Sequence, residues 1–150
     1  MGLGCLENSC NNGQMHEYSV ALRIRGAKLD PTEVTTRLHL APTQVRIAGQ
    51  PRPGGKAVWA ESMWEYEVLP EGKTAWPSLE EGLRTLLSAF QSLNATLEHY
   101  CRDFHVFLWC GHFSSSFDGG PTFSSMLLKQ LGDFGVELYL DTYFSVPTDN

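Results

Sequence analysis

Residues 18–38 read YSVALRIRGAKLDPTEVTTRL, and this stretch joins a strand pattern to the start of a helix. Apolar side chains occupy every second position from Val20 to Ile24, while Arg23 and Arg25 fall on the other parity. Successive side chains of a strand point to opposite faces, so one face of this segment is apolar and the other carries the arginines. The pattern predicts a strand over residues 18–26 with one buried face.

The same stretch then shows how a helix begins. Asp30 is a residue type that caps helices, Pro31 suits the first helical position, and Glu33 completes a capping box. Val34 and Leu38 would face inward from such a helix. We therefore expect a short helix that ends with Leu38.

Outward from this stretch, apolar residues recur either at every second position or at helical spacing. The first spacing indicates a strand, and the second indicates a helix. A second capping box, Ser78 with Glu81, opens the longest helical segment. The predicted strands cover residues 43–47, 58–68, 104–112 and 136–143. A long helix is predicted over residues 79–97, with an interruption near Asn94 as an alternative. A further helix carries Phe123, Leu127 and Leu131.

The predicted order of elements is β-α-β-β-α-β-α-β, which is typical of an α+β domain. We expect a mainly antiparallel sheet with helices packed on one face, broadly ferredoxin-like. The chain has 150 residues, the length of one domain, and we place that domain at residues 16–145, between a leader (1–15) and a short tail (146–150). Its single core should contain Val20, Leu22, Trp64, Leu86 and Leu138.

The composition describes a globular protein with an acidic surface. Hydrophobic residues make up 42% of the chain, which excludes a disordered chain. The net charge is −6 and the basic residues are scattered, so nucleic-acid partners are disfavoured and a basic protein partner is favoured. No apolar run is long enough to span a membrane, so we expect no membrane partner.

Four cysteines are present, and none of them forms a C-x-x-C pair. Small secreted domains that depend on disulfides use denser frameworks, so reduced thiols and a cytoplasmic location are the expectation. Cys110 shares its strand parity with Val106 and Leu108, where burial would raise the pKa of the thiol and lower its reactivity. We expect no cofactor.

Several spaced motifs resemble a known family. In chain order they are GAKLDPTEVT (residues 26–35), LHLAPT (residues 38–43), a Gly/Pro/Arg loop followed by Trp64, the glycines Gly119, Gly120 and Gly135, and LDTY (residues 140–143). Together they resemble the bacterial domain-of-unknown-function family 4279 over residues 18–144. The resemblance implies a shared fold and a bacterial or phage setting, and it implies no established activity.

Two candidate sites involve Cys110 and His112, which lie two positions apart and so share one strand face. With His105 or Cys101 they would form a zinc site, although the spacing matches no established zinc motif. With Asp118 they would supply a nucleophile, a base and an orienting carboxylate. A buried cysteine beside a partly exposed histidine is the simpler interpretation, and we expect neither a metal nor a catalytic set.

The tryptophans offer large rigid faces for packing or for a ligand. Trp64 alternates with Tyr66 and Val68, which predicts that it lies in the core. Trp59 and Trp76 flank loops, where exposed positions are expected.

A further candidate centres on Arg46 and Arg52, which bracket the Gly/Pro loop. Two guanidinium groups would clamp a phosphate or a carboxylate through bidentate hydrogen bonds. No Walker or dinucleotide glycine pattern accompanies them, and solvated arginines paired with the protein's own acids are the simpler interpretation. The candidate ligand pocket consists of Arg46, Arg52, Trp64, His112 and Asp118.

These observations predict a binding module more readily than an enzyme. Small size, net acidity and the lack of catalytic motifs favour a protein-interaction or toxin-immunity-like role, as a monomer or a homodimer. The alternative is a small-molecule sensor or small enzyme with a pocket near the Gly/Pro/Arg loop and the Ser/Gly loop of residues 113–121. A homodimer formed by pairing of edge strands is a third hypothesis.

Overall fold

The computed structural model describes residues 16–145, and these residues form one five-stranded sheet. Three of its four strand pairs are antiparallel, and the last strand runs parallel to its neighbour. The predicted α+β class and the mainly antiparallel sheet are therefore confirmed, with a parallel edge that makes the sheet mixed. The strands, in order across the sheet, are β2 (Gln44–Arg46), β3 (Ser62–Val68), β1 (His16–Gly26), β4 (His105–Ser114) and β5 (Glu137–Phe144).

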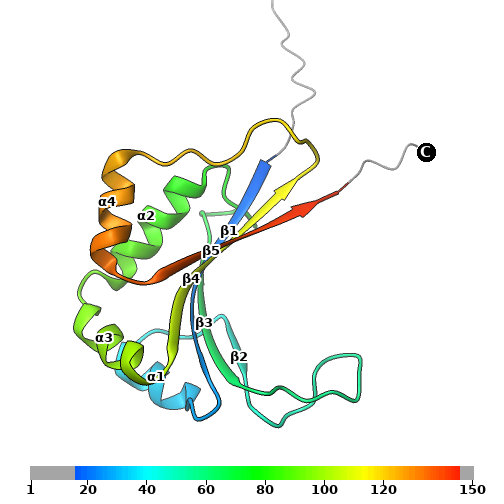
Figure 1. Cartoon of the computed structure of the whole chain (residues 1–150), viewed down its shortest axis with the longest axis vertical. Helices are drawn as coiled ribbons and strands as arrows, with labels where there is room; N and C mark the ends of the chain where they lie inside the picture. The colour runs from blue at the N-terminus through cyan, green and yellow to red at the C-terminus, as the bar shows by residue number, and fades with distance from the viewer. Residues whose placement is uncertain (1–15, 146–150) are drawn as a thin grey trace, which may run out of the picture.

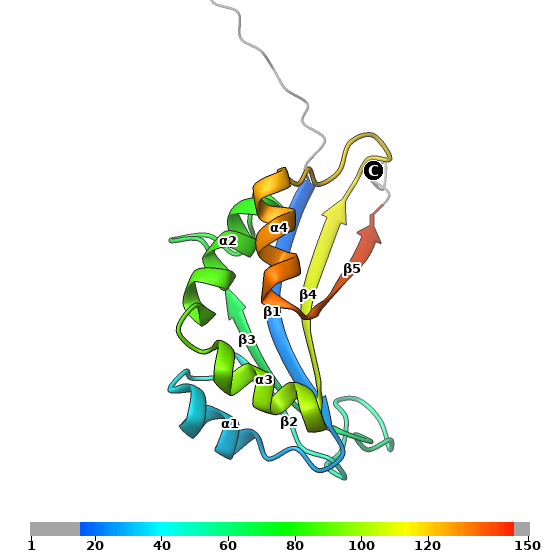
Figure 2. The same ribbon diagram turned by 60° about the vertical axis from the view of Figure 1, so that its left-hand side comes forward.

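All the helices of the described chain cover the same face of the sheet, as the two views in Figures 1 and 2 show. Within residues 16–145 the opposite face carries no helix, and the long loop between β2 and β3 extends on that side. No helix in residues 16–145 is long and apolar enough to cross a membrane. The helices are α1 (Pro31–Leu38), α2 (Leu79–Phe90), α3 (Asn94–Asp103) and α4 (Ser125–Phe134).

The predicted helix starts are confirmed by their caps. The Asp30 carboxylate accepts hydrogen bonds from the backbone N–H groups of Thr32 and Glu33. Ser78 Oγ accepts a hydrogen bond from the backbone N–H of Glu81. Each cap satisfies donors that a helix leaves without an internal partner.

The long helix breaks near Asn94, so the part of the chain that the structure describes has one more helix than the predicted order of elements. The backbone N–H of Gln91 donates to the carbonyl of Ser88, and that of Leu93 donates to the carbonyl of Phe90. These bonds span three residues instead of four, and such tight turns commonly end an α-helix.

The core lies between the helices and the helix-covered face, and four of the five predicted core residues are in it. Val20, Leu22, Trp64 and Leu86 are completely buried. Leu138 is the exception, because 36% of its surface is exposed. Figure 2 shows the reason: α4 lies over the middle of the sheet and leaves β5 uncovered.

Two further expectations were wrong, and hydrogen bonds that neither strand pattern nor loop position predicts explain both. The predicted strand over residues 58–68 begins only at Ser62, and Val58 is exposed. The reason is that residues 49–59 form a separate hairpin. In it, the backbone N–H of Gly49 donates to the carbonyl of Trp59, and the N–H of Trp59 donates to the carbonyl of Gln50. Trp76 is buried instead of exposed, since its indole N–H donates to the carbonyl of Val68 at 2.8 Å.

Candidate functional site

The helix-free face of the sheet, called here the open face, divides into a basic half and an aromatic half. Its side chains come from the odd-numbered residues of β1, β3, β4 and β5, which lie opposite one another in the strand register. Arg23 and Arg25 of β1 stand on it between Glu65 and Met63 of β3 on one side and aromatic residues of β4 on the other.

A cavity of about 280 Å³ lies over the basic half. Its lining residues come from the strands of the sheet and from the loop between β2 and β3. Its lining brings together residues that are up to 84 positions apart in sequence. Those that matter for its chemistry are Arg23, Arg25, Arg46, Arg52, Trp59, Met63 and Phe107.

Trp59 holds the two loop arginines in this cavity. The guanidinium carbon of Arg46 lies 4.2 Å from the centre of the indole ring, and that of Arg52 lies 4.4 Å from it. A cation within about 6 Å of an aromatic centroid is attracted by the negative charge of the ring face. Neither arginine forms an ion pair with an acidic residue within residues 16–145.

The two strand arginines, in contrast, are paired. Arg23 Nε lies 2.5 Å from the carboxylate of Glu65, and Arg25 Nε lies 3.3 Å from that of Glu61. The four guanidinium groups together with the two carboxylates that pair with Arg23 and Arg25 sum to a net charge of +2, although the whole chain carries −6. The basic half is thus a local reversal of the charge of the protein.

Arg46 lines the cavity and has a buried hydrogen-bond donor without a partner. Among the described residues, its Nε is one of two buried side-chain nitrogen or oxygen atoms that have no hydrogen-bond partner, the other being Tyr100 Oη. Burial lowers the pKa of the Arg46 guanidinium, and the positive charges of Arg23 and Arg52 lower it further, while Glu65 acts in the opposite direction. A buried donor without a partner is rare and requires an explanation.

The aromatic half of the open face connects β4 to β5. The rings of Phe107 and Tyr139 lie 4.9 Å apart, and the rings of Phe113 and Tyr143 lie 5.0 Å apart. Between these pairs, the indole N–H of Trp109 donates to the Asp141 carboxylate at 2.6 Å. These cross-strand pairs fix the open-face side chains of β5 in place.

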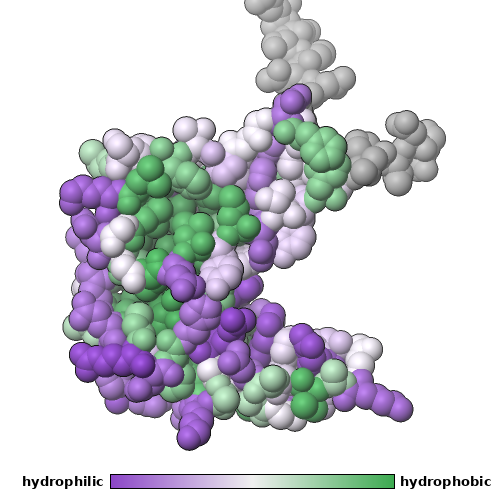
Figure 3. Space-filling model, viewed as in Figure 1, coloured by the Kyte–Doolittle hydropathy of each residue, from purple (hydrophilic) through white to green (hydrophobic). Residues whose placement is uncertain are grey.

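Every residue of β5 is exposed, on both faces of the sheet. On the helix side, Leu138 and Leu140 are exposed, and so are Met126 and Leu128 of α4. In Figure 3, hydrophobic residues gather between α4 and β5 on the face turned to the viewer. We call the exposed apolar residues of β5 and α4 the β5 surface; they are Met126, Leu128, Leu138, Tyr139, Leu140, Tyr143 and Phe144.

The segment of the chain that carries the β5 surface has more acidic than basic residues. Between Arg102 and the end of the described chain, the sequence contains one lysine, Lys129, and no arginine. Lys129 is already paired with Asp133, at 2.9 Å. β5 itself contributes Glu137 and Asp141 to the open face.

The five residues predicted to line one pocket are in three places. Arg46 and Arg52, which bracket the loop, both line the cavity of the basic half. Trp64 is in the core on the other face, where its indole N–H donates to Thr35 Oγ1 at 3.0 Å. His112 and Asp118 lie together at the opposite end of β1, where both contact His16.

Cys110 and His112 share the helix-covered face, as their spacing predicted, and Cys110 is completely buried. Burial raises the pKa of the Cys110 thiol to about 12. His105 lies on the open face, so it does not approach this pair. Within residues 16–145, no three His, Cys, Asp or Glu side chains are grouped so that they would hold a metal ion.

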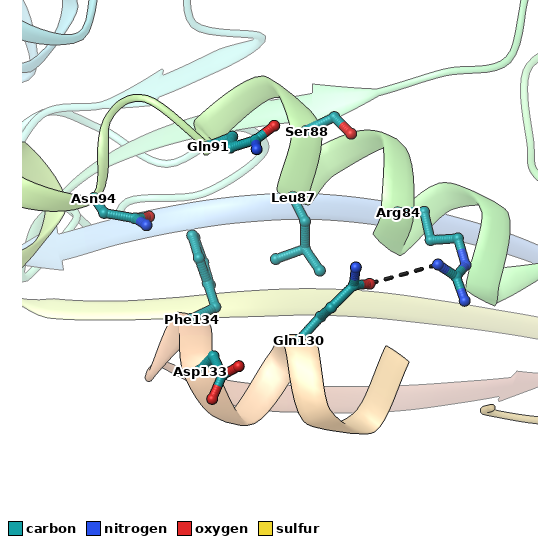
Figure 4. A pocket seen from close by; sticks show the side chains of 8 residues that line it. All are labelled: Arg84, Leu87, Ser88, Gln91, Asn94, Gln130, Asp133 and Phe134. Carbon is teal, nitrogen blue, oxygen red and sulfur yellow. Dashed lines mark hydrogen bonds between the residues drawn. The ribbon is translucent and has the colours of Figure 1, made fainter. Parts of the chain in front are cut away.

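Another cavity, of about 460 Å³, lies between α2 and α4 and is shown in Figure 4. Its two charged residues both have partners, because Arg84 contacts Glu80, Ser124 and Gln130, and Asp133 pairs with Lys129. The remaining lining includes Leu87 and Phe134, which pack against the core. This cavity is a crevice between packed helices, and each charged residue that lines it already has a partner.

Sequence reasoning found Arg46 and Arg52 but missed Trp59, Arg23 and Arg25 as members of the same site. The alternation in β1 already placed Arg23 and Arg25 on the face opposite the core. No sequence signal shows that the loop between β2 and β3 lies beside this face, because that contact depends on tertiary packing.

Comparisons with known proteins agree with the resemblance found in the sequence. A family model described as a domain of unknown function (DUF4279) matches residues 16–145. No curated protein and no solved structure matches the chain.

Proposed function

The chain belongs to the DUF4279 family, whose description assigns no activity, and from the geometry we propose that it is a protein-binding module. Its partner adds an extended segment as a further strand along β5. The observation that carries this proposal is that all eight residues of β5 are exposed although five of them are large and apolar. Exposed apolar patches on a soluble domain commonly mark sites of interaction.

The backbone of β5 is available for such pairing. Among the described strands, β5 pairs with β4 alone and forms the edge of the sheet. An edge strand presents free backbone N–H and C=O groups, and an added strand satisfies them while its side chains meet both faces. Natural proteins protect exposed edges with lysines, prolines or bulges, and β5 contains no lysine or proline.

The charges of β5 specify the chemistry of the partner. A segment that alternates apolar residues with Lys or Arg would place its apolar side chains on Leu138 and Leu140 and its cations near Glu137 and Asp141. A second copy of the chain fits less well, because its own β5 brings two more carboxylates and no basic residue. The partner is therefore a basic segment of a different protein.

A toxin neutralised by this protein would be one such partner, so an immunity role is a specific form of the proposal. A cytoplasmic location belongs to it as well. Cys101 and Cys110, the cysteines of the described chain, are both free thiols, as expected in a reducing compartment. Co-expression with the product of a neighbouring gene tests the immunity role, since a toxin partner would be co-purified with the protein.

The binding function itself is tested with labelled octapeptides and the purified chain. Fluorescence anisotropy should show saturable binding of peptides that alternate apolar residues with Lys, and weaker binding when Glu replaces Lys. Leu140→Lys should abolish the binding, because it places a charge on the apolar row of the edge. Val45→Lys is a matched control: Val45 lies on β2, the opposite edge strand, and has the same exposed fraction of 41% as Leu140.

Equal effects of the two lysine variants would contradict the proposal, since they would show that β5 has no special role. Concentration-dependent dimerisation in light scattering that Leu140→Lys prevents would replace the proposed partner by a second copy. Unchanged binding of the peptides by Leu140→Lys would exclude β5 as the site.

A further inference from the structure

The cavity of the basic half is a second site, separate from the β5 surface. It lies over β1, β2 and β3, while β5 is at the far edge of the sheet. The protein holds four arginines around this cavity, although the net charge of the whole chain is −6. Like charges that are held together lower stability unless a further group compensates them, so their convergence indicates a bound anion.

The arrangement around Arg46 shows where the anion would lie. Arg46 Nε is buried without a partner, while Arg52, on the same tryptophan ring, also lacks an acidic partner in the described chain. Guanidinium groups bind carboxylate and phosphate oxygens in a bidentate manner. Stacking on Trp59 fixes the two groups, which lowers the entropy that a ligand must overcome to order them.

The charge of the site selects between these two anions. The two glutamates neutralise Arg23 and Arg25, which leaves the charges of Arg46 and Arg52 to be matched. A carboxylate would neutralise only one of them. A phosphate monoester carries about −1.5 to −2 near neutral pH and offers three acceptor oxygens.

The other residues that line the cavity indicate which chemical group is attached to the phosphate. Val58, Met63 and Phe107 contribute apolar surface beside the arginines. The cavity volume of about 280 Å³ is slightly below the range of roughly 300–1,000 Å³ that drug-sized ligands occupy. A phosphate group with one ring or a short apolar chain fits this space.

We propose that the cavity between the open face and the β2–β3 loop binds a small organic phosphate monoester, with Arg46 and Arg52 holding the phosphoryl group. This inference does not depend on the proposed strand addition at β5, and each of the two can fail without the other. Phenyl phosphate is the simplest probe, because it combines a dianionic phosphate with one aromatic ring.

Isothermal titration calorimetry at low ionic strength tests the proposal with the full chain. Phenyl phosphate should bind saturably and more tightly than inorganic phosphate, which lacks the ring, and more tightly than benzoate, which carries a single charge. Arg46→Gln and Arg52→Gln should each weaken phenyl phosphate binding by about tenfold or more, the loss expected for a charge-assisted hydrogen-bond pair. Arg52 is exposed, so this variant should fold even if the Arg46 variant does not.

Arg37→Gln is the matched control, because it removes the same charge from α1, on the helix-covered side. Its binding should equal that of the unmodified chain. The proposal is overturned if phenyl phosphate shows no saturable binding at millimolar concentration. It is also overturned if Arg37→Gln weakens binding as much as Arg52→Gln does, or if benzoate binds as tightly as phenyl phosphate.

Discussion

His16 Nδ1 lies 2.8 Å from His112 Nε2, at the end of the sheet where β1 begins and β4 ends. The other ring nitrogen of His16 lies 2.8 Å from the carbonyl oxygen of Asp118, which can only accept. In the neutral pair, His16 therefore donates through Nε2 and accepts at Nδ1 the proton of His112 Nε2. His112 is buried and stacks on Tyr18, with 4.8 Å between the ring centres.

This contact predicts that the protein loses stability in mild acid. Burial lowers the pKa of His112 from its ordinary 6.5, and the nearby His16 lowers it further. As the pH falls through about 6.5, the unfolded chain takes up this proton before the folded chain does, so the stability contribution is complete above that pH and decreases below it. Urea unfolding between pH 8 and pH 5.5 should show this decrease.

The variant His112→Gln removes the titrating group, so its stability should depend less on pH over the same range. His99→Gln is the control, because His99 is exposed on α3. An equally steep pH dependence in His112→Gln and in the unmodified chain would show that another group causes the effect.

A second prediction concerns the close packing of α2 on the sheet. A Cβ atom at Gly82 would lie 2.7 Å from Val20 Cγ2 and 3.0 Å from Trp76 Cδ1, and all three residues are buried. Gly82→Ala should therefore lower the free energy of unfolding by about 1–3 kcal/mol, the usual effect of overpacking a core. Chemical denaturation measures the change.

Gly132 in α4 is the matched control, since a Cβ atom there would meet nothing within 4 Å. Gly132→Ala should stabilise the protein by up to about 1 kcal/mol, because alanine favours a helix more than glycine does. Stabilisation by both alanines would mean that α2 lies farther from the sheet than described.

The sequence predicted what depends on neighbouring residues and missed what depends on distant ones. The strand β1 and the caps at Asp30 and Ser78 follow from local spacing and local hydrogen bonds, and the structure confirms them. Leu138 has the same alternating pattern as Leu22, yet one is exposed and the other buried, because α4 does not extend over β5. Whether a helix covers a strand is a tertiary property that alternation does not contain.

In the candidate site, too, local sequence identified some residues and tertiary contacts brought in the others. Arg46 and Arg52 were recognised as a pair because they bracket one loop. Arg25 and Phe107 joined them only through the sheet register and the position of the loop. The position of Trp59 beside a loop predicts exposure, whereas in the structure the two guanidinium groups partly cover its ring.

A third prediction follows from the burial of Cys110. Its thiol is completely buried and has a pKa of about 12, so at pH 8 almost none of it is the reactive thiolate. Iodoacetamide should leave Cys110 unmodified in the folded protein and modify it fully in urea. Peptide mapping by mass spectrometry measures this, with the exposed Cys101 as the internal comparison. Rapid alkylation of Cys110 in the folded state would contradict its position in the core.

The last prediction is a variant at the cavity that strengthens phenyl phosphate binding, whereas the arginine variants weaken it. Glu61 is half exposed and pairs with Arg25, so Glu61→Gln should free this guanidinium and raise the net charge of the site from +2 to +3 without disturbing the core. Phenyl phosphate should then bind about two- to fivefold more tightly at low salt, and the gain should shrink in 0.5 M salt, because exposed charges are screened there. Glu33→Gln is a close control: Glu33 forms an exposed ion pair with Arg37 on α1, and its side-chain exposure of 50% matches the 47% of Glu61. A gain from Glu61→Gln alone would show that the local charge of the four arginines sets the affinity, whereas equal gains from both variants would show that only the total charge of the protein matters.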